Sequence, residues 1–234
     1  MLVAGFPAGS FGTNCYVVAP AAGEQCVVID PGQDAVDGIE EILTEHRLQP
    51  VAVLLTHGHV DHVWSVVPVC GAHEIPAYIH GADRAMMADP AAAFGQPGEP
   101  MFGRITFGEP SDVIELTGTT DIPLAGLEFR VDHTPGHTKG SMTFRLGAEV
   151  FFSGDLLFAG SIGRTDLPGG DFEEILDSLA RVVLPLPDEL PVLSGHGPAT
   201  TVGAERAANP YLQEAIARAG GAPPAQLWTP SRGL

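Results

Sequence analysis

The stretch LLTHGHVDH, from Leu54 to His62, places three histidines and one aspartate within its last six residues. It continues the apolar run VAVLLT, which has the length and composition of a strand that is buried on both faces. The sequence therefore predicts that a buried strand ends here and delivers several imidazole and carboxylate groups to one place.

Three further segments repeat this arrangement. VFF leads into SGD and delivers Asp155, PVL leads into SGH and delivers His196, and RVDHTPGH delivers His137 through a Thr-Pro-Gly turn. Ligand sites in α/β sheets lie beyond the carboxyl ends of the strands, so the four segments are expected to converge on one rim. The candidate metal ligands are His57, His59, Asp61, His62, His137, Asp155 and His196.

These donors favour a particular kind of centre. Imidazole nitrogens and carboxylate oxygens suit zinc, iron or manganese, and no thiolate is among them. Seven groups are too many for one tetrahedral ion with an open position, but they suit two ions about 3.5–4 Å apart. We therefore expect two divalent metal ions per chain, with zinc as the first choice and iron or manganese as alternatives. Gly58 lets the chain bend between His57 and His59 without a clash at Cβ.

Composition restricts the partners. The chain has 234 residues and a formal net charge of -18, which repels nucleic acid and anionic membrane surfaces. Neither a basic leader segment nor an apolar stretch of membrane-spanning length is evident, so a cytoplasmic location is expected. The cysteines Cys15, Cys26 and Cys70 lack CxxC spacing and are expected to be buried, reduced thiols.

The remaining sequence alternates between strand and helix patterns. Helices are predicted at residues 34–47, at 171–183 with Asp171 as N-cap, and at 203–219. Residues 86–110 are rich in Gly and Pro and form either a flap near a site or a surface loop. We find no internal linker, which predicts one domain over residues 1–220 and a Pro-rich tail over 221–234.

The order of these motifs resembles the metallo-β-lactamase superfamily, whose signature is His-x-His-x-Asp-His followed by a distant His, a distant Asp and a last His. The segments GDLLFAGSIGRTDLPGGD and SGHGPATTVGAERAANPYL resemble the short glyoxalase II-like branch of hydroxyacylglutathione hydrolases. The resemblance implies an α/β fold, an αββα sandwich of two mixed sheets flanked by helices. It also implies a first ion held by His57, His59 and His137, and a second held by Asp61, His62 and His196, with Asp155 bridging.

The resemblance further implies a metal-dependent hydrolase that cleaves S-(2-hydroxyacyl)glutathione by attack of metal-bound hydroxide. A thiolate leaves easily, and Asp61 is the residue expected to orient the attacking water as well as to bind metal. The relatives hold glutathione with a Lys and a Tyr, where this chain has Arg164 and Asp166. Arg164 is therefore the candidate substrate anchor, and the thiol is either glutathione or another thiol of low molecular weight.

Other functions remain open at this point. Persulfide dioxygenases of the same superfamily share TPGHT and GRTD and use a single iron, which makes them the alternative reading. RNA-processing relatives are disfavoured by the acidic charge, and a β-lactamase by the lack of the usual zinc-binding cysteine and of a secretion signal. His133 is expected to be structural, Asp30 either orients a ligand histidine or caps a turn, and both a monomer and a homodimer remain open.

Overall fold

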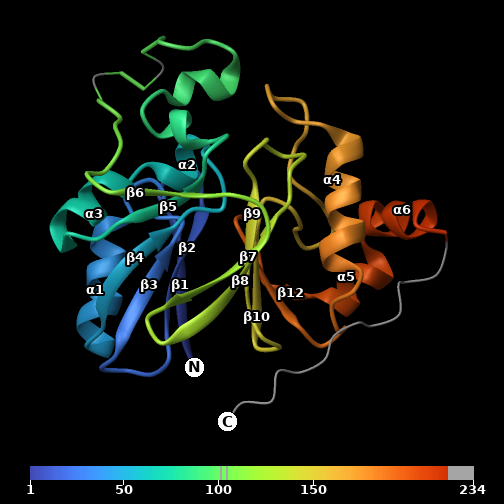
Figure 1. Ribbon diagram of the computed structural model, residues 1–234, viewed down its shortest axis with the longest axis horizontal. Coiled ribbons are helices and arrows are strands. Elements are labelled where there is room, and N and C mark those ends of the chain that lie inside the picture. The colour runs from blue at the N-terminus through green and yellow to red at the C-terminus, as the bar shows by residue number, and fades with distance from the viewer. Residues whose placement is uncertain (101, 104, 221–234) are drawn as a thin grey trace.

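The computed structural model describes residues 1–100, 102–103 and 105–220, and it contains two six-stranded sheets that face each other. Helices lie on the outer side of each sheet (Figure 1), which confirms the predicted αββα sandwich of mixed sheets. The tail predicted at residues 221–234 lies outside the described residues.

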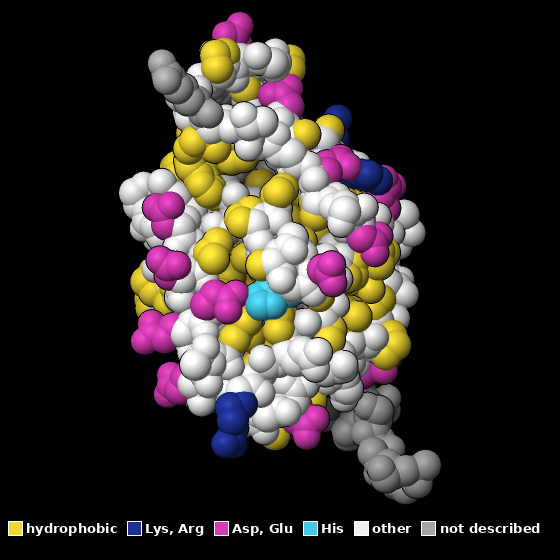
Figure 2. All heavy atoms as spheres, turned by 90° about the vertical axis from the view of Figure 1, so that its left-hand side faces the viewer, with side chains coloured by type: hydrophobic (Ala, Val, Ile, Leu, Met, Phe, Trp, Pro, Cys, Tyr) yellow, Lys and Arg dark blue, Asp and Glu magenta, His cyan; other side chains and the backbone are white. Residues whose placement is uncertain are grey.

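The first sheet has its strands in sequence order. It consists of β1 (Leu2–Ala8), β2 (Thr13–Ala19), β3 (Gln25–Ile29), β4 (Gln49–Leu54), β5 (Ala77–His80) and β6 (Val113–Leu116). Strands β3 to β6 run parallel, whereas β1 and β2 are antiparallel. The outer side is covered by α1 (Val36–His46) and α3 (Val66–His73) (Figure 1). The surface on this side carries many Asp and Glu side chains and few Lys or Arg (Figure 2).

The second sheet runs in the order β12-β11-β10-β9-β8-β7. Its strands are β7 (Thr120–Leu124), β8 (Leu127–His133), β9 (Met142–Leu146), β10 (Val150–Gly154), β11 (Pro191–Ser194) and β12 (Thr200–Thr201). Only β10 and β11 are parallel. Four helical segments follow β10: α4 (Phe172–Ser178), η3 (Leu179–Val183), α5 (Val202–Ala208) and α6 (Pro210–Arg218).

The core has three parts because each sheet is apolar on both faces. Side chains from both sheets, including Ile29, Leu54, Phe129, Phe144 and Phe152, fill the space between them. A second cluster lies beneath α1 and α3, and a third beneath α4 to α6. The three cysteines are buried and unpaired, as predicted.

Most of the predicted elements are confirmed. Helix α1 begins two residues later than predicted, and α4 begins after Asp171, whose carboxylate accepts a hydrogen bond from the backbone N–H of Glu174 as an N-cap should. Phe172, the first residue of this helix, is 36% exposed and packs edge-on against the ring of Tyr211. Strands β1, β7 and β12 were not predicted.

The single helix predicted at 203–219 is wrong. The chain forms α5 and α6, which are separated at Asn209. The side chain of Asn209 accepts hydrogen bonds from the N–H groups of Tyr211 and Leu212, and Pro210 occupies the first position of the new helix. Proline lacks the N–H that a continuous helix requires, so the chain restarts there.

The segment at 86–110 has some regular structure. It includes the second half of η1 (Arg84–Met87), all of η2 (Pro90–Phe94) and irregular chain beyond them. Phe102 and Phe107 pack edge-on against Trp64. No helix in the described part of the chain is long and apolar enough to cross a membrane.

Candidate metal centre

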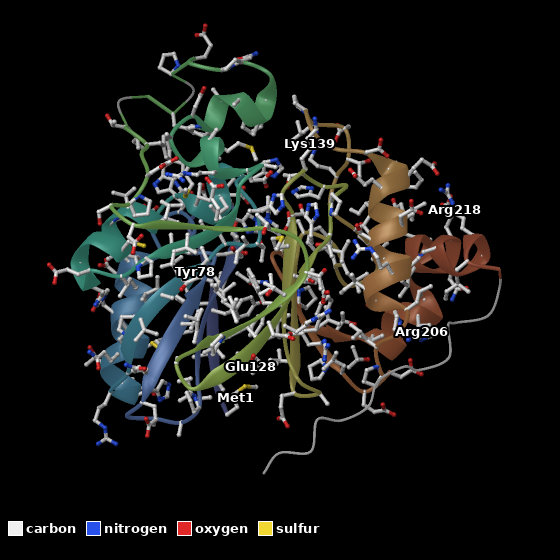
Figure 3. The ribbon with its side chains drawn as sticks, in the orientation of Figure 1. Met1, Tyr78, Glu128, Lys139, Arg206 and Arg218 are labelled. Carbon is white, nitrogen blue, oxygen red and sulfur yellow. The ribbon has the colours of Figure 1, made fainter. Side chains whose placement is uncertain are left out.

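The loops that follow β4, β8, β10 and β11 meet at one end of the sandwich, and they bring all seven candidate ligands together. Lys139, on the loop that follows β8, lies at this end of the molecule, whereas Met1 lies at the other (Figure 3). Within this cluster, donor atoms of three groups lie within 4.8 Å of one another: His57, His59 and His137; Asp61, His62 and His196; and His57, His62 and Asp155.

The first group has the geometry of a metal site. Nε2 of His57 lies 3.1 Å from Nδ1 of His59 and 3.1 Å from Nε2 of His137. Nitrogens bound at 2.0–2.1 Å to one tetrahedral ion lie about 3.3 Å apart. The three imidazoles are therefore spaced as if around a single cation.

Asp155 lies between this group and the other. Its Oδ2 is 3.6 Å from Nε2 of His137 and 3.7 Å from Nε2 of His196, and its Oδ1 is 3.4 Å from Nε2 of His62. Oδ2 of Asp61 is 3.0 Å from Nε2 of His196 and 3.5 Å from Nε2 of His62. The carboxylate of Asp155 can thus face two cations at once.

The outer nitrogens of three ligand histidines are hydrogen bonded, which directs the inner nitrogens towards the centre. Nδ1 of His137 donates to the backbone carbonyl of Arg164 at 2.7 Å, and Nδ1 of His62 lies 2.9 Å from Oδ2 of Asp30. The hydroxyl of Thr56 donates to Asp30, so it accepts from Nδ1 of His57 at 3.1 Å. In each ring Nε2 is the nitrogen that faces the centre.

Two of the inward atoms are buried without a partner. Nε2 of His62 and Oδ1 of Asp155 make no hydrogen bond within the described residues. A buried polar atom without a partner costs free energy, and a cation between these two groups would satisfy both. The residues therefore fit a bound metal.

The charges in the second group also favour a cation. Burial disfavours a charge on His62, but the carboxylates of Asp61, Asp155 and Asp30 outweigh burial and raise its pKa to about 10. Burial likewise opposes ionisation of Asp61, but His62 and His196 hold its pKa below the ordinary value. Positive charge is strongly stabilised at this point of the structure.

The first group is different, because two of its histidines, His57 and His59, are held neutral. Burial, assisted by the neighbouring imidazoles, lowers the pKa of His57 and brings that of His59 to about 3. A neutral imidazole is the form that binds a metal ion. The lone pairs of these rings are therefore available at neutral pH.

Asp83 is a buried residue that the sequence did not single out. Its carboxylate accepts hydrogen bonds from the N–H of Gly58 at 3.0 Å, the N–H of Gly140 at 2.8 Å and the hydroxyl of Thr138 at 2.6 Å. Burial raises the pKa of Asp83 despite these bonds. The residue joins the His57–His59 turn to the loop that carries His137.

Residues of β2 connect the two sheets at the same centre. The hydroxyl of Thr13 donates to Oδ2 of Asp61 at 2.9 Å. The side-chain amide of Asn14 donates to the carbonyls of Ser194 and Gly197, on either side of His196. No sequence signal marked these two residues.

Close packing at the centre explains why two positions are occupied by glycine. A Cβ at Gly58 would come within 2.6 Å of the carbonyl oxygen of Asp83, which supports the predicted need for glycine between the two histidines. A Cβ at Gly195 would overlap the carboxylate of Asp155. Both positions therefore require the smallest residue.

A cavity of about 410 Å³ opens over the candidate ligands. Its wall contains the candidate ligands His59, Asp61, His137, Asp155 and His196, together with Phe11, Phe94, Phe158, Arg164 and Leu167. Phe94 belongs to η2, which is part of the 86–110 segment. Of the two alternatives for this segment, its contact with the cavity favours a flap near a site over a surface loop. Arg164 lines the cavity but also forms a bidentate ion pair with Asp166.

The other residues that the sequence singled out have structural contacts. Asp30 is hydrogen bonded to His62 and orients its ring, which is one of the two roles predicted for Asp30 from the sequence. His133 donates from Nε2 to the carbonyl of Lys139 and stacks on His80 with ring centroids 4.3 Å apart.

The sequence of this chain matches a known protein family. A family model described as the metallo-beta-lactamase superfamily matches residues 8–196. The chain belongs to that superfamily. An uncharacterised protein of Mycobacterium bovis is 46% identical over 220 residues, covering 91% of this chain and 98% of its own. The hydroxyacylglutathione hydrolase GloC of Haemophilus influenzae is 33% identical over 216 residues, covering 88% and 95%.

Solved structures agree on the metallo-beta-lactamase fold. The B3 metallo-beta-lactamase BLEG-1 superposes with a TM-score of 0.81 at 40% identity, covering 90% of this chain and 99% of that one. TTHA1623, in a di-iron-bound form, gives 0.74 at 38% identity and covers 89% and 99%. ETHE1 from Myxococcus xanthus gives 0.74 at 25% identity and covers 97% and 94%. Membership in this superfamily makes the chain a metallohydrolase-type protein with a candidate His and Asp metal centre.

Proposed function

We propose that the protein is a dinuclear metallohydrolase that cleaves a thioester, S-(2-hydroxyacyl)glutathione or the ester of a similar low-molecular-weight thiol. The observation that carries the dinuclear assignment is the position of Asp155, which faces both ligand groups and has an unpartnered buried oxygen. The 33% identity to a hydroxyacylglutathione hydrolase supports the substrate class.

The proposed ligands divide between two cations as the family resemblance implied. His57, His59 and His137 would hold one cation, and Asp61, His62 and His196 the other, with Asp155 shared between them. When bound, the cations would supply hydroxide at neutral pH and polarise the substrate carbonyl. Zinc is our first choice, and iron or manganese the alternatives, because the donor set does not select among them.

The chain's own residues position the reactants. Asp61 lines the cavity, and its Oδ2 is fixed by Thr13 and His196, so it can accept a hydrogen bond from water and orient it. The rings of Phe11, Phe94 and Phe158 give the cavity apolar walls that fit a thioester and exclude bulk water. The exposed guanidinium of Arg164 is placed to bind a carboxylate of the thiol moiety.

The leaving group is consistent with this site. A thiol has a pKa of about 8.5, so its thiolate departs without a strong general acid. Among the described residues that line the cavity there is no lysine, tyrosine or cysteine that would serve as one.

Two other activities have specific support. The TPGHT and GRTD motifs favour persulfide dioxygenation with a single iron as the alternative. The 40% identity to a B3 metallo-beta-lactamase makes hydrolysis of a β-lactam a further activity to test, although the sequence disfavoured it.

The test combines metal content with a substrate panel. Freshly purified protein is analysed for metals and then assayed for S-lactoylglutathione hydrolysis, oxygen uptake with glutathione persulfide, and hydrolysis of a β-lactam. We expect about two metals per chain, as in two-metal sites, and thioester cleavage. A single iron with persulfide-dependent oxygen uptake would replace the proposal with its alternative.

Variants test the ligand assignment. Asp155→Ala and His59→Ala should each abolish turnover and reduce metal content. His73→Ala is the matched control, because this histidine pairs with Glu40 on the outer surface and should leave both quantities unchanged. A fully active Asp155→Ala enzyme would exclude the bridging role.

A further inference from the structure

A second cavity lies outside the metal centre. It measures about 390 Å³ and shares no lining residue with the cavity over the ligands. Its lining contains Thr119, Arg130, Asp132, Arg145, Arg181, Val182, Pro185 and Leu186. Three of the chain's eleven basic residues thus gather at one place in a protein of net charge -18.

Strand alternation explains why these arginines face away from the core. Phe129 and Val131 of β8 and Phe144 of β9 lie in the cluster between the two sheets. Their neighbours Arg130 and Arg145 point to the opposite face, because successive side chains of a strand alternate. The third arginine, Arg181, comes from η3 on that outer side.

The arrangement of Arg130 and Arg145 is unfavourable by itself. The two residues are direct cross-strand partners on β8 and β9. Like charges placed opposite each other on neighbouring strands are destabilising. An anion bound between the two guanidinium groups would offset this repulsion.

The guanidinium groups have N–H donors that remain available to bind such an anion. Arg130 has carboxylate oxygens of Asp121 and Asp132 near it, each 3.4 Å away. Arg145 donates from Nη1 to the carbonyl of Gly147, and no carboxylate in the described part of the chain comes within 4.0 Å of it. Each guanidinium carries five N–H donors, so most of those on Arg145 remain available.

Arg181 is held in a similar way. One Nη2 donor binds the carbonyl of His133, and the rest of the exposed guanidinium is free of carboxylates within the described residues. Burial lowers the pKa of Arg145, the carboxylates of Asp132 and Asp121 oppose this shift, and the positive charge of Arg130 adds to it. Three cationic groups therefore face two carboxylates, which leaves an excess of positive charge at this place.

We propose that this cavity binds a small anionic molecule through a phosphate or carboxylate group held by Arg130, Arg145 and Arg181. Planar guanidinium groups bind both kinds of oxyanion through paired N–H donors. The other wall is apolar, formed by Val182, Pro185 and Leu186, and it suits a less polar remainder of the ligand. This site is separate from the proposed hydrolytic centre and does not depend on its substrate.

The test uses the full-length, metal-loaded protein. Inorganic phosphate and succinate are titrated separately by calorimetry at low ionic strength, so that one probe represents each oxyanion. Saturable binding of at least one anion is expected, and Arg145→Gln should weaken it by about tenfold or more. Arg130→Gln should have a similar effect, and Arg145→Lys, which keeps the charge but loses the planar fork, should fall between.

Arg218→Gln is the matched control. This residue lies on α6, where it pairs with Glu173 and Glu214, and it does not line the cavity (Figure 3). The variant should bind as tightly as the unaltered protein. Binding of phosphate alone would identify a phosphorylated ligand, and binding of succinate alone a carboxylate ligand.

Two results would overturn the proposal. One is the absence of binding of either anion at millimolar concentration. The other is binding that neither Arg145→Gln nor Arg130→Gln weakens, which would locate the anion at the metal centre instead. Thermal unfolding of each variant checks the fold, and if Arg145→Gln does not fold, Arg130→Gln decides the outcome.

Discussion

Oδ2 of Asp30 lies 2.9 Å from Nδ1 of His62, and both side chains are buried beneath the candidate metal centre. The same carboxylate accepts hydrogen bonds from the N–H and the hydroxyl of Thr56. A carboxylate behind a ligand histidine fixes the ring and raises its affinity for a cation. The pair therefore gives a direct test of how the structure supports metal binding.

Asp30→Asn should lower metal affinity by about 10- to 100-fold, because the amide is neutral and binds the imidazole less strongly. The measurement is metal content after dialysis against graded concentrations of a chelator. Asp37→Asn, at an exposed position in the first turn of α1, is the control. Equal metal retention by Asp30→Asn and the unaltered protein would contradict this role.

Asp83→Ala should reduce the free energy of unfolding by about 3 kcal/mol, since three buried donors lose their acceptor. These donors belong to Gly58, Thr138 and Gly140. Asp83→Asn keeps one acceptor oxygen and should lose less. Urea denaturation of the metal-loaded protein measures both values, and a loss of under about 1 kcal/mol for the alanine variant would show that the carboxylate matters little to stability.

The low pKa of His59 predicts how stability depends on pH in the metal-free protein. Its pKa is about 3 in the folded chain and about 6.5 when unfolded, so below pH 6.5 only the unfolded chain takes up the proton. Stability must then fall as the pH drops from about 6.5 towards 3, by about 1.4 kcal/mol per pH unit, or about 2 kcal/mol by pH 5.

His59→Gln removes this contribution. Urea unfolding at about pH 7.5 and about pH 5 should give a difference between the two pH values that is about 2 kcal/mol smaller in the variant. His73→Gln, on the outer surface, serves as the control and should leave the difference unchanged. A difference that His59→Gln does not alter would mean that the imidazole is not held neutral by the fold.

Arg164→Gln tests the substrate anchor of the proposed thioesterase. Because a carboxylate contact far from the reacting atoms is made equally in the ground and transition states, KM should rise by about tenfold with kcat nearly unchanged. Steady-state kinetics with S-lactoylglutathione measure this. Asp166→Asn releases Arg164 from its ion pair and should not raise KM; a rise in both variants would point to the ion pair itself rather than to substrate contact.

Much of the fold and of the centre could be predicted from the sequence, because the signals are local. A strand that is buried on both faces reads as a short apolar run, and the polar residues that follow it mark the sheet edge. This is why β4, β8, β10 and β11, with the seven candidate ligands after them, were located in advance. The edge strands β1 and β7 were missed because they are partly exposed and lack a strong pattern.

The contacts that hold the centre were decided only by the tertiary structure. Asp83 is 55 residues from Thr138, and Asn14 is 180 residues from Ser194. No periodicity or turn pattern connects residues so far apart, since their meeting depends on the order and register of strands in two packed sheets. The three arginines of the second cavity come together for the same reason. Sequence by itself determined which groups end each strand, whereas the pairing of the strands determined which groups meet.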